Sequence, residues 1–385
     1  MKIIISTNSA WTLYEFRLSL ILKLKEIGHE VIAVAPKDKY LKKFKNHGVR
    51  YRNVSIPITQ NNVFSEFKAI FSYYLIYKEE NPDLVHHFSI KPIIYGSIAS
   101  RILKISSSIN TITGLGIGFS KKKGLGSLII KLLFKFSRSK KFQYIFQNMY
   151  DRDFFIENKF INKSQAHIVL GSGINMSKYS SKGKNIFAKG NKFIKFIMYS
   201  RMIWDKGVRE YLEASKIFSN LYPNKATFTL LGGPDPKNIN RVDAEWITNP
   251  NAIPLNWLKE KVHDYGVEWY PHDNNVLPYI LRNDVIVLPT YYPEGLPRSI
   301  LESMSCERIV IATDVPGCKD IVQDGITGYL VKPRSVSSLV QAFERIMNNT
   351  LEAAEISRQA KKSIEKKFCD AVVIEKVLKV YNLMK

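Results

Sequence analysis

The feature that most constrains the fold of this 385-residue chain is a regular alternation of strand-like and helix-like segments. Short apolar runs at residues 2–7 and 29–36 flank a longer segment of helical character at 14–28. The alternation stops in a polar stretch at 177–192, rich in lysine, serine and glycine, and restarts at residue 193. Such alternation is typical of parallel sheets covered by helices. We therefore predict an α/β protein with two doubly wound, Rossmann-like domains.

These patterns place an N-terminal domain at residues 1–178 and a C-terminal domain at 191–367, with a final helix at about 368–385 that packs back on the first domain. The length suits two domains, and an apolar content of 45% is enough for two cores. The three cysteines form no spaced framework, which favours a reducing compartment. The N-terminus lacks a signal-peptide pattern and no apolar run is long enough to span a membrane. We expect a cytoplasmic protein.

The formal net charge of +23 is concentrated in the first half. Residues 1–190 hold 31 basic and 11 acidic residues, whereas residues 191–385 hold 26 and 23. Residues 101–150 hold ten basic residues and no acidic one. This asymmetry predicts that the first half meets an anionic partner or surface.

One segment inside the acid-free stretch alternates apolar and basic residues. At helical spacing, Leu128 and Leu132 form an apolar stripe beside Lys131 and Lys135. Such a helix can lie in a lipid interface, and an ordinary amphipathic helix with a solvated basic face is the alternative. The interfacial interpretation predicts that Lys131, Lys135 and Arg138 dock on an anionic membrane surface.

Two loops that follow predicted strands of the second half carry polar groups suited to an anion. Arg201 and Lys206 follow the strand that ends near Ser200. Pro297 suits the first turn of a helix, and the free N–H groups that follow it attract phosphate. Because ligands of open α/β sheets bind at the carboxyl ends of strands, we expect these groups to converge on a phosphate.

Two carboxylates, Glu294 and Glu302, flank that helix start in the stretch "YYPEGLPRSILESMS". Phosphate does not explain a carboxylate in a basic setting, whereas a sugar does, because an ionised carboxylate accepts from two vicinal hydroxyls. A nucleoside-diphosphate sugar carries both chemistries. The alternative is a surface helix with acids placed favourably near its N-terminus.

The segment "PEGLPRSILESMSCERIVIATDVPGCKDIVQDGITGYLV" resembles the signature of the retaining glycosyltransferases of family 4, which have the GT-B fold. Their E-x7-E element is similar to Glu294 and Glu302, and their GR-x4-KG loop resembles the stretch from Ser200 to Gly207. In the first half, "STNSAWTLYEFR", "INTITGLG" and "GSGINMSKY" are similar to a branch that extends undecaprenyl-diphosphate-linked sugars, including α-1,3-N-acetylgalactosaminyltransferases. The resemblance implies two domains that face each other across a cleft.

On this resemblance, Glu294, Arg201 and Lys206 are the catalytic candidates. Glu302 would accept from the ribose hydroxyls, Glu294 would hold the donor sugar, and the two cations would neutralise the leaving diphosphate. The remaining donor-binding candidates are Ser200, Gly233, Gly295, Leu296 and Pro297. No cofactor and no metal are expected.

The first half departs from the family pattern. A histidine–glycine pair is common in the family where this chain has Thr113-Gly114, and the first loop here is not glycine-rich. Lys91 matches a lysine of the lipid-linked branch and would bind the acceptor diphosphate, although a surface lysine is an equal alternative. The acceptor-site or sugar-binding candidates are Arg17, Lys91, Thr113, Gly114 and Gly173.

The resulting expectation is transfer of a sugar, such as N-acetylgalactosamine, from a UDP-sugar to an undecaprenyl-diphosphate-linked saccharide in the assembly of O-antigen, capsule or a similar glycan. The enzyme would act peripherally at the inner face of the cytoplasmic membrane. Two alternatives are a nucleotide-sugar epimerase on the same fold and a basic nucleic-acid-binding protein. The second lacks a known nucleic-acid-binding pattern, so no nucleic-acid partner is expected.

Overall fold

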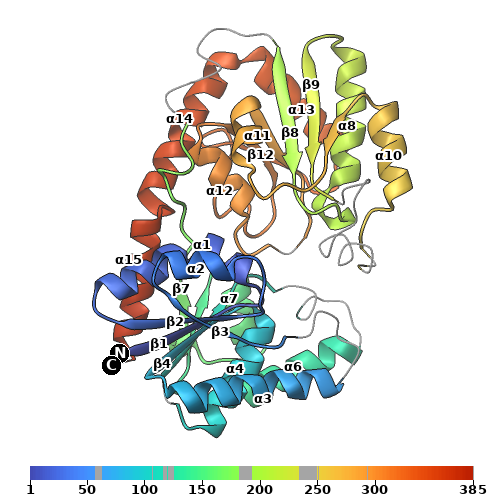
Figure 1. Cartoon of the computed structure of the whole chain (residues 1–385). Coiled ribbons are helices and arrows are strands. Elements are labelled where there is room, and N and C mark those ends of the chain that lie inside the picture. The colour runs from blue at the N-terminus through green and yellow to red at the C-terminus, as the bar shows by residue number, and fades with distance from the viewer. Residues whose placement is uncertain are drawn as a thin grey trace. The chain divides into compact units, whose positions relative to one another are not determined.

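The computed structural model describes every residue except 57–62, 106, 116–118, 120–124, 182–192, 234–248, 250, 293 and 385. Most of the predicted polar linker therefore lies outside the described residues. The chain forms two compact units, each a parallel sheet with helices on both faces (Figure 1). The prediction of two doubly wound α/β domains is confirmed. No helix in the described ranges is both long and apolar enough to cross a bilayer.

The boundaries of the units differ from the predicted ones. Unit 1 comprises Met1–Gly173, Pro293–Leu296 and Asp370–Lys385, and unit 2 comprises Ile174–Tyr292 and Pro297–Cys369. The first segment of unit 1 thus ends at Gly173 and not at residue 178. The short stretch before Pro297 belongs with unit 1 although it lies between two elements of unit 2.

Unit 1 contains a seven-stranded sheet in the order β3-β2-β1-β4-β5-β6-β7, and all of its strand pairs are parallel. The strands are β1 Lys2–Ser6, β2 Glu30–Ala35, β3 Arg50–Asn53, β4 Leu84–Phe88, β5 Ser107–Ile112, β6 Gln143–Phe146 and β7 Ala166–Ile168. The helices are α1 Ala10–Glu26, α2 Leu41–Asn46, α3 Val63–Glu80, α4 Ile90–Ile102, α6 Leu125–Ser137, α7 Met149–Glu157 and α15 Asp370–Asn382, with a short 3-10 helix at Lys163–Gln165.

The two faces of the unit 1 sheet are covered by different helices. Along β1, Ile3 and Ile5 face a core that includes residues of α1, α2 and α15, whereas Ile4 faces a core with α3, α4, α6 and α7. This alternation follows from the two-residue period of a strand. Every residue of β1 after Lys2 is buried, as expected for a central strand of a parallel sheet.

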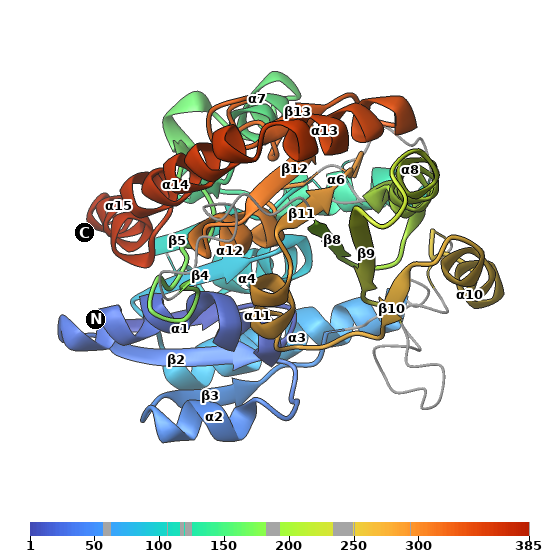
Figure 2. The same ribbon diagram turned by 90° about the horizontal axis from the view of Figure 1, so that it is seen from above.

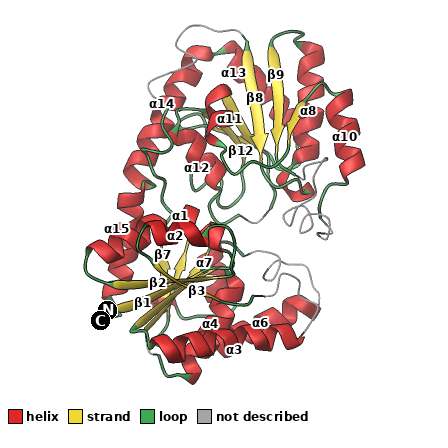
Figure 3. Ribbon diagram, in the orientation of Figure 1, coloured by secondary structure: helices red, strands yellow, loops and turns green. Residues whose placement is uncertain are grey.

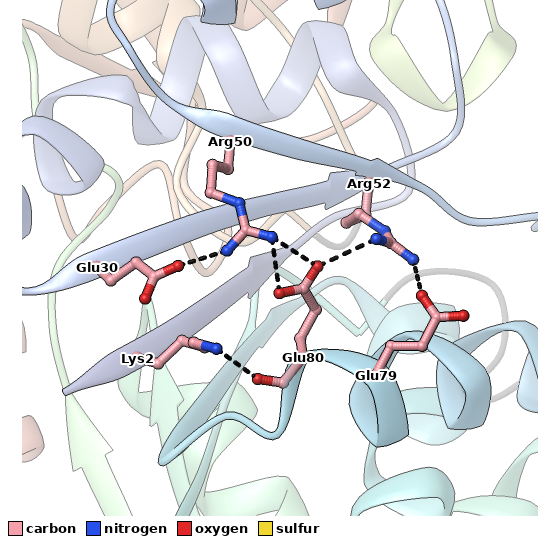
Figure 4. A network of polar contacts seen from close by, with 6 residues as sticks. All are labelled: Lys2, Glu30, Arg50, Arg52, Glu79 and Glu80. Carbon is pink, nitrogen blue, oxygen red and sulfur yellow. Dashed lines mark hydrogen bonds and ion pairs between the residues drawn. The ribbon is translucent and has the colours of Figure 1, made fainter.

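A cluster of charges fastens the edge strand β3 to the end of α3 (Figure 4). Arg50 forms ion pairs with Glu30 and Glu80, and Arg52 forms ion pairs with Glu79 and Glu80. The carboxylate of Glu80 is nearly buried and accepts from Arg50 at 2.9 Å and from Arg52 at 3.2 Å. Glu30 and Arg50 are the first residues of β2 and β3, and Glu79 and Glu80 are the last residues of α3. The cluster therefore lies at the edge of the sheet opposite the carboxyl ends of the strands, and we assign it to the folding of the sheet edge.

Unit 2 contains a six-stranded parallel sheet in the order β10-β9-β8-β11-β12-β13. The strands are β8 Ile194–Tyr199, β9 Ala226–Leu231, β10 Glu268–Tyr270, β11 Val285–Leu288, β12 Ile309–Thr313 and β13 Tyr329–Val331. The helices are α8 Val208–Leu221, α10 Leu255–Asp264, α11 Leu277–Arg282, α12 Arg298–Ser305, α13 Val336–Asn348 and α14 Thr350–Lys367, with a 3-10 turn at Trp204–Lys206.

In both units the strand order reverses beside the first strand, between β1 and β4 in unit 1 and between β8 and β11 in unit 2. Figure 2 shows β3 with α2 at one edge of the first sheet and β10 with α10 at one edge of the second. Helices flank the strands of each unit on both sides (Figure 3). A reversal of strand order opens a crevice at the carboxyl ends of the strands, which is where such folds bind ligands.

Candidate functional site

The reversal point of unit 2 is built from the loops after β8 and β11. The backbone N–H groups of Tyr291 and Tyr292 donate to the carbonyl oxygen of Asp205 at 2.8 and 2.9 Å. The hydroxyl of Thr290 donates to the same oxygen at 3.1 Å. Three donors on one carbonyl hold the two loops together, so residues that the sequence separates by more than eighty positions form one surface.

Gly207 is required for this close approach. Its φ of 79° lies in the left-handed region, and a Cβ placed on it would come within 2.2 Å of the Pro289 carbonyl oxygen. Gly232, after β9, has the same role on the other side of β8, because its Cβ would come within 2.0 Å of the Ser200 carbonyl oxygen. These glycines let three strand-end loops meet without a side chain between them.

The two cations predicted for the diphosphate meet at one aromatic ring. The guanidinium carbon of Arg201 and the ammonium nitrogen of Lys206 each lie 5.3 Å from the centre of the Tyr292 ring. Arg201 is exposed and Lys206 is buried. The ring therefore gives two like charges a shared partner, at a distance where cation–π attraction is effective. The sequence analysis did not identify Tyr292 as a site residue, and the only signal for it was its position after a buried strand.

The other donor-binding candidates of unit 2 line neighbouring strand ends. Ser200 directly follows β8, and its hydroxyl donates to the Arg201 carbonyl oxygen at 3.1 Å. Gly233 follows β9 with φ 83°, and a Cβ on it would come within 2.9 Å of Met202 Cγ. The carboxyl ends of β8 and β9 thus bring Ser200, Arg201 and Gly233 to one edge of the sheet.

The helix α12 begins directly after Pro297, as predicted, with Pro297 as its N-cap residue and Arg298 as its first residue. The carbonyl oxygen of Ser299 accepts from the Tyr199 hydroxyl at 2.8 Å, which fastens the helix to the end of β8. Burial and the nearby Glu302 raise the pKa of Tyr199 well above its usual value, so this hydroxyl keeps its proton and donates.

Glu302 is buried in α12 and forms an ion pair with Arg298, one helical turn earlier, with Arg298 Nε donating to Oε1 at 3.1 Å. The predicted ribose acceptor therefore already has a partner within its own helix. The ion pair fixes the rotamer of the carboxylate and supplies the counter-charge that a buried carboxylate requires.

Glu294 lies in unit 1, not with Glu302. The side-chain amide of Asn148 donates to the carbonyl oxygens of Gly295, at 2.9 Å, and Glu294, at 3.2 Å. A Cβ on Gly295 would come within 2.1 Å of the Thr113 carbonyl oxygen. The loop that carries Glu294 is thus fastened to the carboxyl ends of β5 and β6. Asn148 was also missed, although an asparagine before a helix is an N-cap signal.

The neighbouring positions share this edge of the unit 1 sheet. Gly114 follows Thr113 after β5 with a φ of 136°, a conformation that a side chain would strain. Leu296 is buried and closes the stretch of residues 294–296. Asn148 also accepts from the Asp151 N–H at 2.7 Å as the N-cap of α7, so its amide is held on both sides.

Three acceptor candidates have structural partners. Arg17 is buried, and its guanidinium lies 4.0 Å from the centre of the Phe88 ring. Lys91 is half-buried and pairs with Glu66 at 3.7 Å, and burial lowers the pKa of its ammonium group. A Cβ on Gly173 would come within 2.4 Å of the side chain of Asp370. Each of the three therefore has a role in the fold of unit 1 that sequence reasoning did not anticipate.

The membrane-docking candidates lie on or just after α6. Lys135 is exposed, with its ammonium nitrogen 5.7 Å from the centre of the Phe160 ring, and Lys131 is half-buried. Arg138 donates through Nη1 to the carbonyl oxygens of Lys159, at 2.6 Å, and Phe160, at 3.1 Å. Arg138 is therefore committed to the loop after α7, and its mutation would test the fold as well as any docking.

Among the residues that the structure describes, no three or more His, Cys, Asp or Glu side chains are grouped so as to hold a metal ion. His86 and His87 on β4 are both fully buried and point to opposite faces of the sheet. His87 binds Tyr77 and Asn110, and His86 binds Tyr381 of α15, so both belong to the core.

Two family models match separate parts of the chain. Residues 181–363 match the family described as "Glycosyl transferases group 1", and residues 2–148 match "Glycosyl transferase 4-like". The two matches correspond closely to unit 2 and unit 1.

Curated relatives extend the match over nearly the whole chain. The chain is 24% identical to the N,N'-diacetylbacillosaminyl-diphospho-undecaprenol alpha-1,3-N-acetylgalactosaminyltransferase of Campylobacter jejuni, over 99% of this chain and 98% of the relative. It is 27% identical to the UDP-Gal:alpha-D-GlcNAc-diphosphoundecaprenol alpha-1,3-galactosyltransferase of Escherichia coli, over 77% and 73%. It is 25% identical to the capsular polysaccharide biosynthesis glycosyltransferase CapM of Staphylococcus aureus, over 93% and 91%.

Solved structures share the fold at low identity. A glycosyltransferase of Rickettsia africae superposes with a TM-score of 0.77 at 18% identity, over 100% of this chain and 98% of that one. Anabaena HepE in complex with UDP-glucose superposes with a TM-score of 0.76 at 17% identity, over the full length of both chains.

Proposed function

We propose that this chain, which belongs to the family-4 glycosyltransferases of the GT-B fold, transfers a sugar from a UDP-sugar to a lipid-linked saccharide in the assembly of a bacterial polysaccharide such as an O-antigen or capsule. An N-acetylhexosamine such as N-acetylgalactosamine is the proposed sugar, on the basis of the similarity to the Campylobacter jejuni enzyme along the whole chain. The comparisons lend no support to an epimerase or to a nucleic-acid-binding protein.

The observation that carries the proposal is the pair of cations at the reversal point of unit 2. Arg201 and Lys206 each lie 5.3 Å from the centre of the Tyr292 ring, at the strand ends where doubly wound folds bind phosphates. Two positive charges that share an aromatic ring are prearranged for a group with two negative charges. The diphosphate of a nucleotide sugar is such a group, and it gains charge when the sugar leaves.

The carboxylates supply the recognition of hydroxyls. Glu302 would accept from the ribose hydroxyls while Arg298 holds it in one rotamer. Glu294, on the loop fastened by Asn148, would bind the donor sugar. The charge on each carboxylate makes these hydrogen bonds stronger than those of a neutral acceptor.

We propose that the reaction retains the anomeric configuration. The bond between the sugar's anomeric carbon and the diphosphate breaks as the acceptor oxygen attacks from the same face. The acceptor proton passes to the leaving diphosphate oxygen, so no side chain is needed as a general base. Arg201 and Lys206 stabilise the charge on the diphosphate, which is the electrostatic task that a divalent metal performs in other transferases. The proposed enzyme is therefore metal-independent.

The proposed acceptor has a polyprenyl chain that stays in the bilayer, so the enzyme has to work at the membrane surface. The acid-free helix α6, with Lys131 and Lys135, would meet the anionic headgroups. Arg138, just after α6, would join them, but because it also donates to backbone carbonyls its replacement would not separate docking from folding.

Transfer of radiolabelled sugar from a panel of UDP-sugars to a short-chain lipid-diphosphate saccharide tests the proposal. Arg201→Ala and Lys206→Ala are each expected to cost about 2–4 kcal/mol of transition-state stabilisation, as for the loss of an oxyanion donor. Lys216→Ala is the matched control, because that lysine also lies over an aromatic ring, 4.6 Å from the centre of Tyr265. Full activity in EDTA is expected, and activity lost to EDTA and restored by manganese would contradict the metal-independent mechanism.

A further inference from the structure

The outer face of α3 carries a continuous row of exposed apolar side chains. Phe67 is 67% exposed and Phe71 is 59% exposed, and Leu75 follows one turn later. Phe64, at the start of the helix, is 83% exposed. These residues recur every three or four positions, so they lie along one side of the helix. The opposite side of α3, with Tyr73 and Tyr77, is buried in the core of unit 1.

A second exposed apolar row lies on α6, which packs against the same neighbour as α3. Leu132 is 57% exposed and Phe136 is 63% exposed, and Leu128 and Ile129 are exposed one turn before Leu132. Both α3 and α6 pack against α4 on one face of the unit 1 sheet (Figure 1). The two rows lie on helices that pack against the same neighbour, and we call them together the α3–α6 face, defined by Phe64, Phe67, Phe71, Leu75, Leu128, Ile129, Leu132 and Phe136.

A face of this composition is rarely left in water. Phenylalanine and leucine contribute most of the hydrophobic free energy of burial, and soluble monomers seldom expose a contiguous patch of several large apolar residues without a binding role. Exposed apolar residues scattered singly need no such explanation. The row on α3 is not scattered, because its members follow the helical period over more than two turns.

Basic residues accompany the apolar ones. The basic residues on the two helices are Lys68, Lys78, Lys131 and Lys135, and Lys104 follows α4, which packs against both. The acidic residues of α3 are paired: Glu66 with Lys91, Glu79 with Arg52 and Glu80 with Arg50 and Arg52. The helix α6 has no acidic residue. With the basic partners of those glutamates counted, the two helices carry more positive than negative charge beside their apolar rows.

We infer that the α3–α6 face is a membrane anchor that inserts its phenylalanine and leucine side chains into the interfacial region of an anionic bilayer. Apolar side chains of one helix face enter the acyl boundary, and lysines at its margin meet the lipid phosphates. A second copy of the chain fits less well. A twofold pairing of this face places like-charged lysines opposite each other, whereas anionic lipid supplies the opposite charge.

This inference deepens the proposed function and rests on it for its purpose. The start of α3 lies at the carboxyl edge of the sheet, because Glu66 pairs with Lys91 immediately after β4. The most exposed phenylalanines are therefore on the same edge as the strand-end loops of unit 1. Insertion at this place would hold those loops at the level of the lipid phosphates, where a lipid-diphosphate acceptor lies.

The anchor differs in a measurable way from docking by charge alone. Electrostatic attraction between exposed lysines and headgroups is screened at high salt, whereas burial of apolar side chains is not. We therefore expect binding to anionic vesicles that weakens with salt but keeps a salt-resistant part. The salt-resistant part belongs to the apolar rows of α3 and α6, and the contribution of α3 is absent if only the basic segment of α6 docks.

The test is cosedimentation of the full chain with vesicles of phosphatidylglycerol and phosphatidylcholine, at about 0.05 M and about 0.5 M NaCl. The variant Phe67→Gln with Phe71→Gln keeps helix propensity and removes two anchors. Its partition coefficient is expected to fall at least tenfold at both salt concentrations. The control is Leu221→Gln with Leu351→Gln, which removes two exposed leucines of unit 2 and should leave binding within twofold of wild type.

A variant that gains a signal keeps the proposal testable if the Phe67/Phe71 double variant does not fold. In Phe67→Trp, the added tryptophan should be quenched by brominated lipids relative to wild type, and a tryptophan in Leu351→Trp should not. Equal vesicle binding by wild type and the Phe67/Phe71 variant, or no quenching of Phe67→Trp, would overturn the anchor. A wild-type dimer that the Phe67/Phe71 variant turns into a monomer, without vesicle binding, would assign the face to a second copy.

The outcome is separable from that of the proposed function. Vesicle binding needs no sugar transfer, and the Phe67/Phe71 variant should turn over a soluble, short-chain acceptor at the wild-type rate while it loses activity on acceptor embedded in vesicles. Vesicle binding without transfer of any sugar would leave the anchor standing and refute the transferase proposal.

Discussion

Replacing Glu302 with glutamine separates its two roles, in the fold of α12 and in ligand binding. The carboxylate is buried, and its side chain is 9% exposed beside an Arg298 side chain that is 18% exposed. Arg298 Nε donates to Oε1 at 3.1 Å. Glutamine preserves the shape and one acceptor oxygen but removes the charge. The variant is therefore expected to fold with a reduced stability and to bind UDP weakly.

The magnitude follows from the charge on the hydrogen bonds. A hydrogen bond to a charged group contributes about 1.5–3 kcal/mol, roughly twice a neutral one. If Glu302 accepts from both ribose hydroxyls, the loss of its charge removes about half of each of two hydrogen bonds, in total about 1.5–3 kcal/mol, which corresponds to roughly ten- to hundredfold in Kd. The alanine variant should lose at least as much, because it also leaves Arg298 without its carboxylate.

Isothermal titration with UDP and thermal unfolding are to be measured on the same samples. Glu307→Gln is the matched control, because Glu307 is also an ion-paired glutamate of unit 2, 3.3 Å from the ammonium of Lys361. Both variants should unfold at a lower temperature than wild type, and only Glu302→Gln should lose UDP affinity. A folded Glu302→Gln variant with wild-type UDP affinity would refute the ribose assignment and leave Glu302 as a partner of Arg298 alone.

Three further outcomes are expected. Burial lowers the pKa of His87 from 6.5 to about 4, so the neutral ring stabilises the fold fully above pH 6.5, and this stability is lost as the pH falls toward 4. The free energy of urea unfolding should fall by about 3 kcal/mol over this range. An equal pH dependence in His87→Asn would contradict the assignment. Gly207→Ala should destabilise the protein by more than the ~1–2 kcal/mol of left-handed strain, whereas Gly266→Ala, with φ 65° and nothing within 4 Å of its Cβ, should cost the strain alone in the same melts. Tyr292→Phe should keep kcat/KM, and Tyr292→Leu should lower it about five- to hundredfold by removing the ring from both cations; equal rates would show that the ring does not position them.

The sequence by itself determined the architecture, because the period of apolar residues is a local property. Buried parallel strands such as β1 are continuous apolar runs, and each is followed by a helix of recognisable length. The same local order placed Arg201, Lys206 and Glu302 after particular strands. Their role in binding a ligand could be predicted because a parallel sheet brings the carboxyl ends of all its strands to one edge, independently of the loop conformations.

Only the tertiary structure decided which groups share a partner. The ring of Tyr292 lies beside both Arg201 and Lys206, although Tyr292 is more than eighty positions from either in the sequence. No local periodicity predicts a contact at that separation. Arg17 and Arg138 carry the charge expected of anion-binding residues. In the fold, Arg17 lies over the ring of Phe88, and Arg138 donates to backbone carbonyl oxygens. A cation carries no local signal of its partner, because that partner is supplied by another element only when the chain is folded.

The row of phenylalanines on α3 shows the same limit from the other side. Its pattern of apolar residues suits a helix packed in a core, and the sequence offers no way to tell which apolar side is covered. The fold buries Tyr73 and Tyr77 and leaves Phe67 and Phe71 in solvent. The periodicity of apolar residues shows that a helix has an apolar side. Which side stays exposed depends on the helices and strands that the fold places against it.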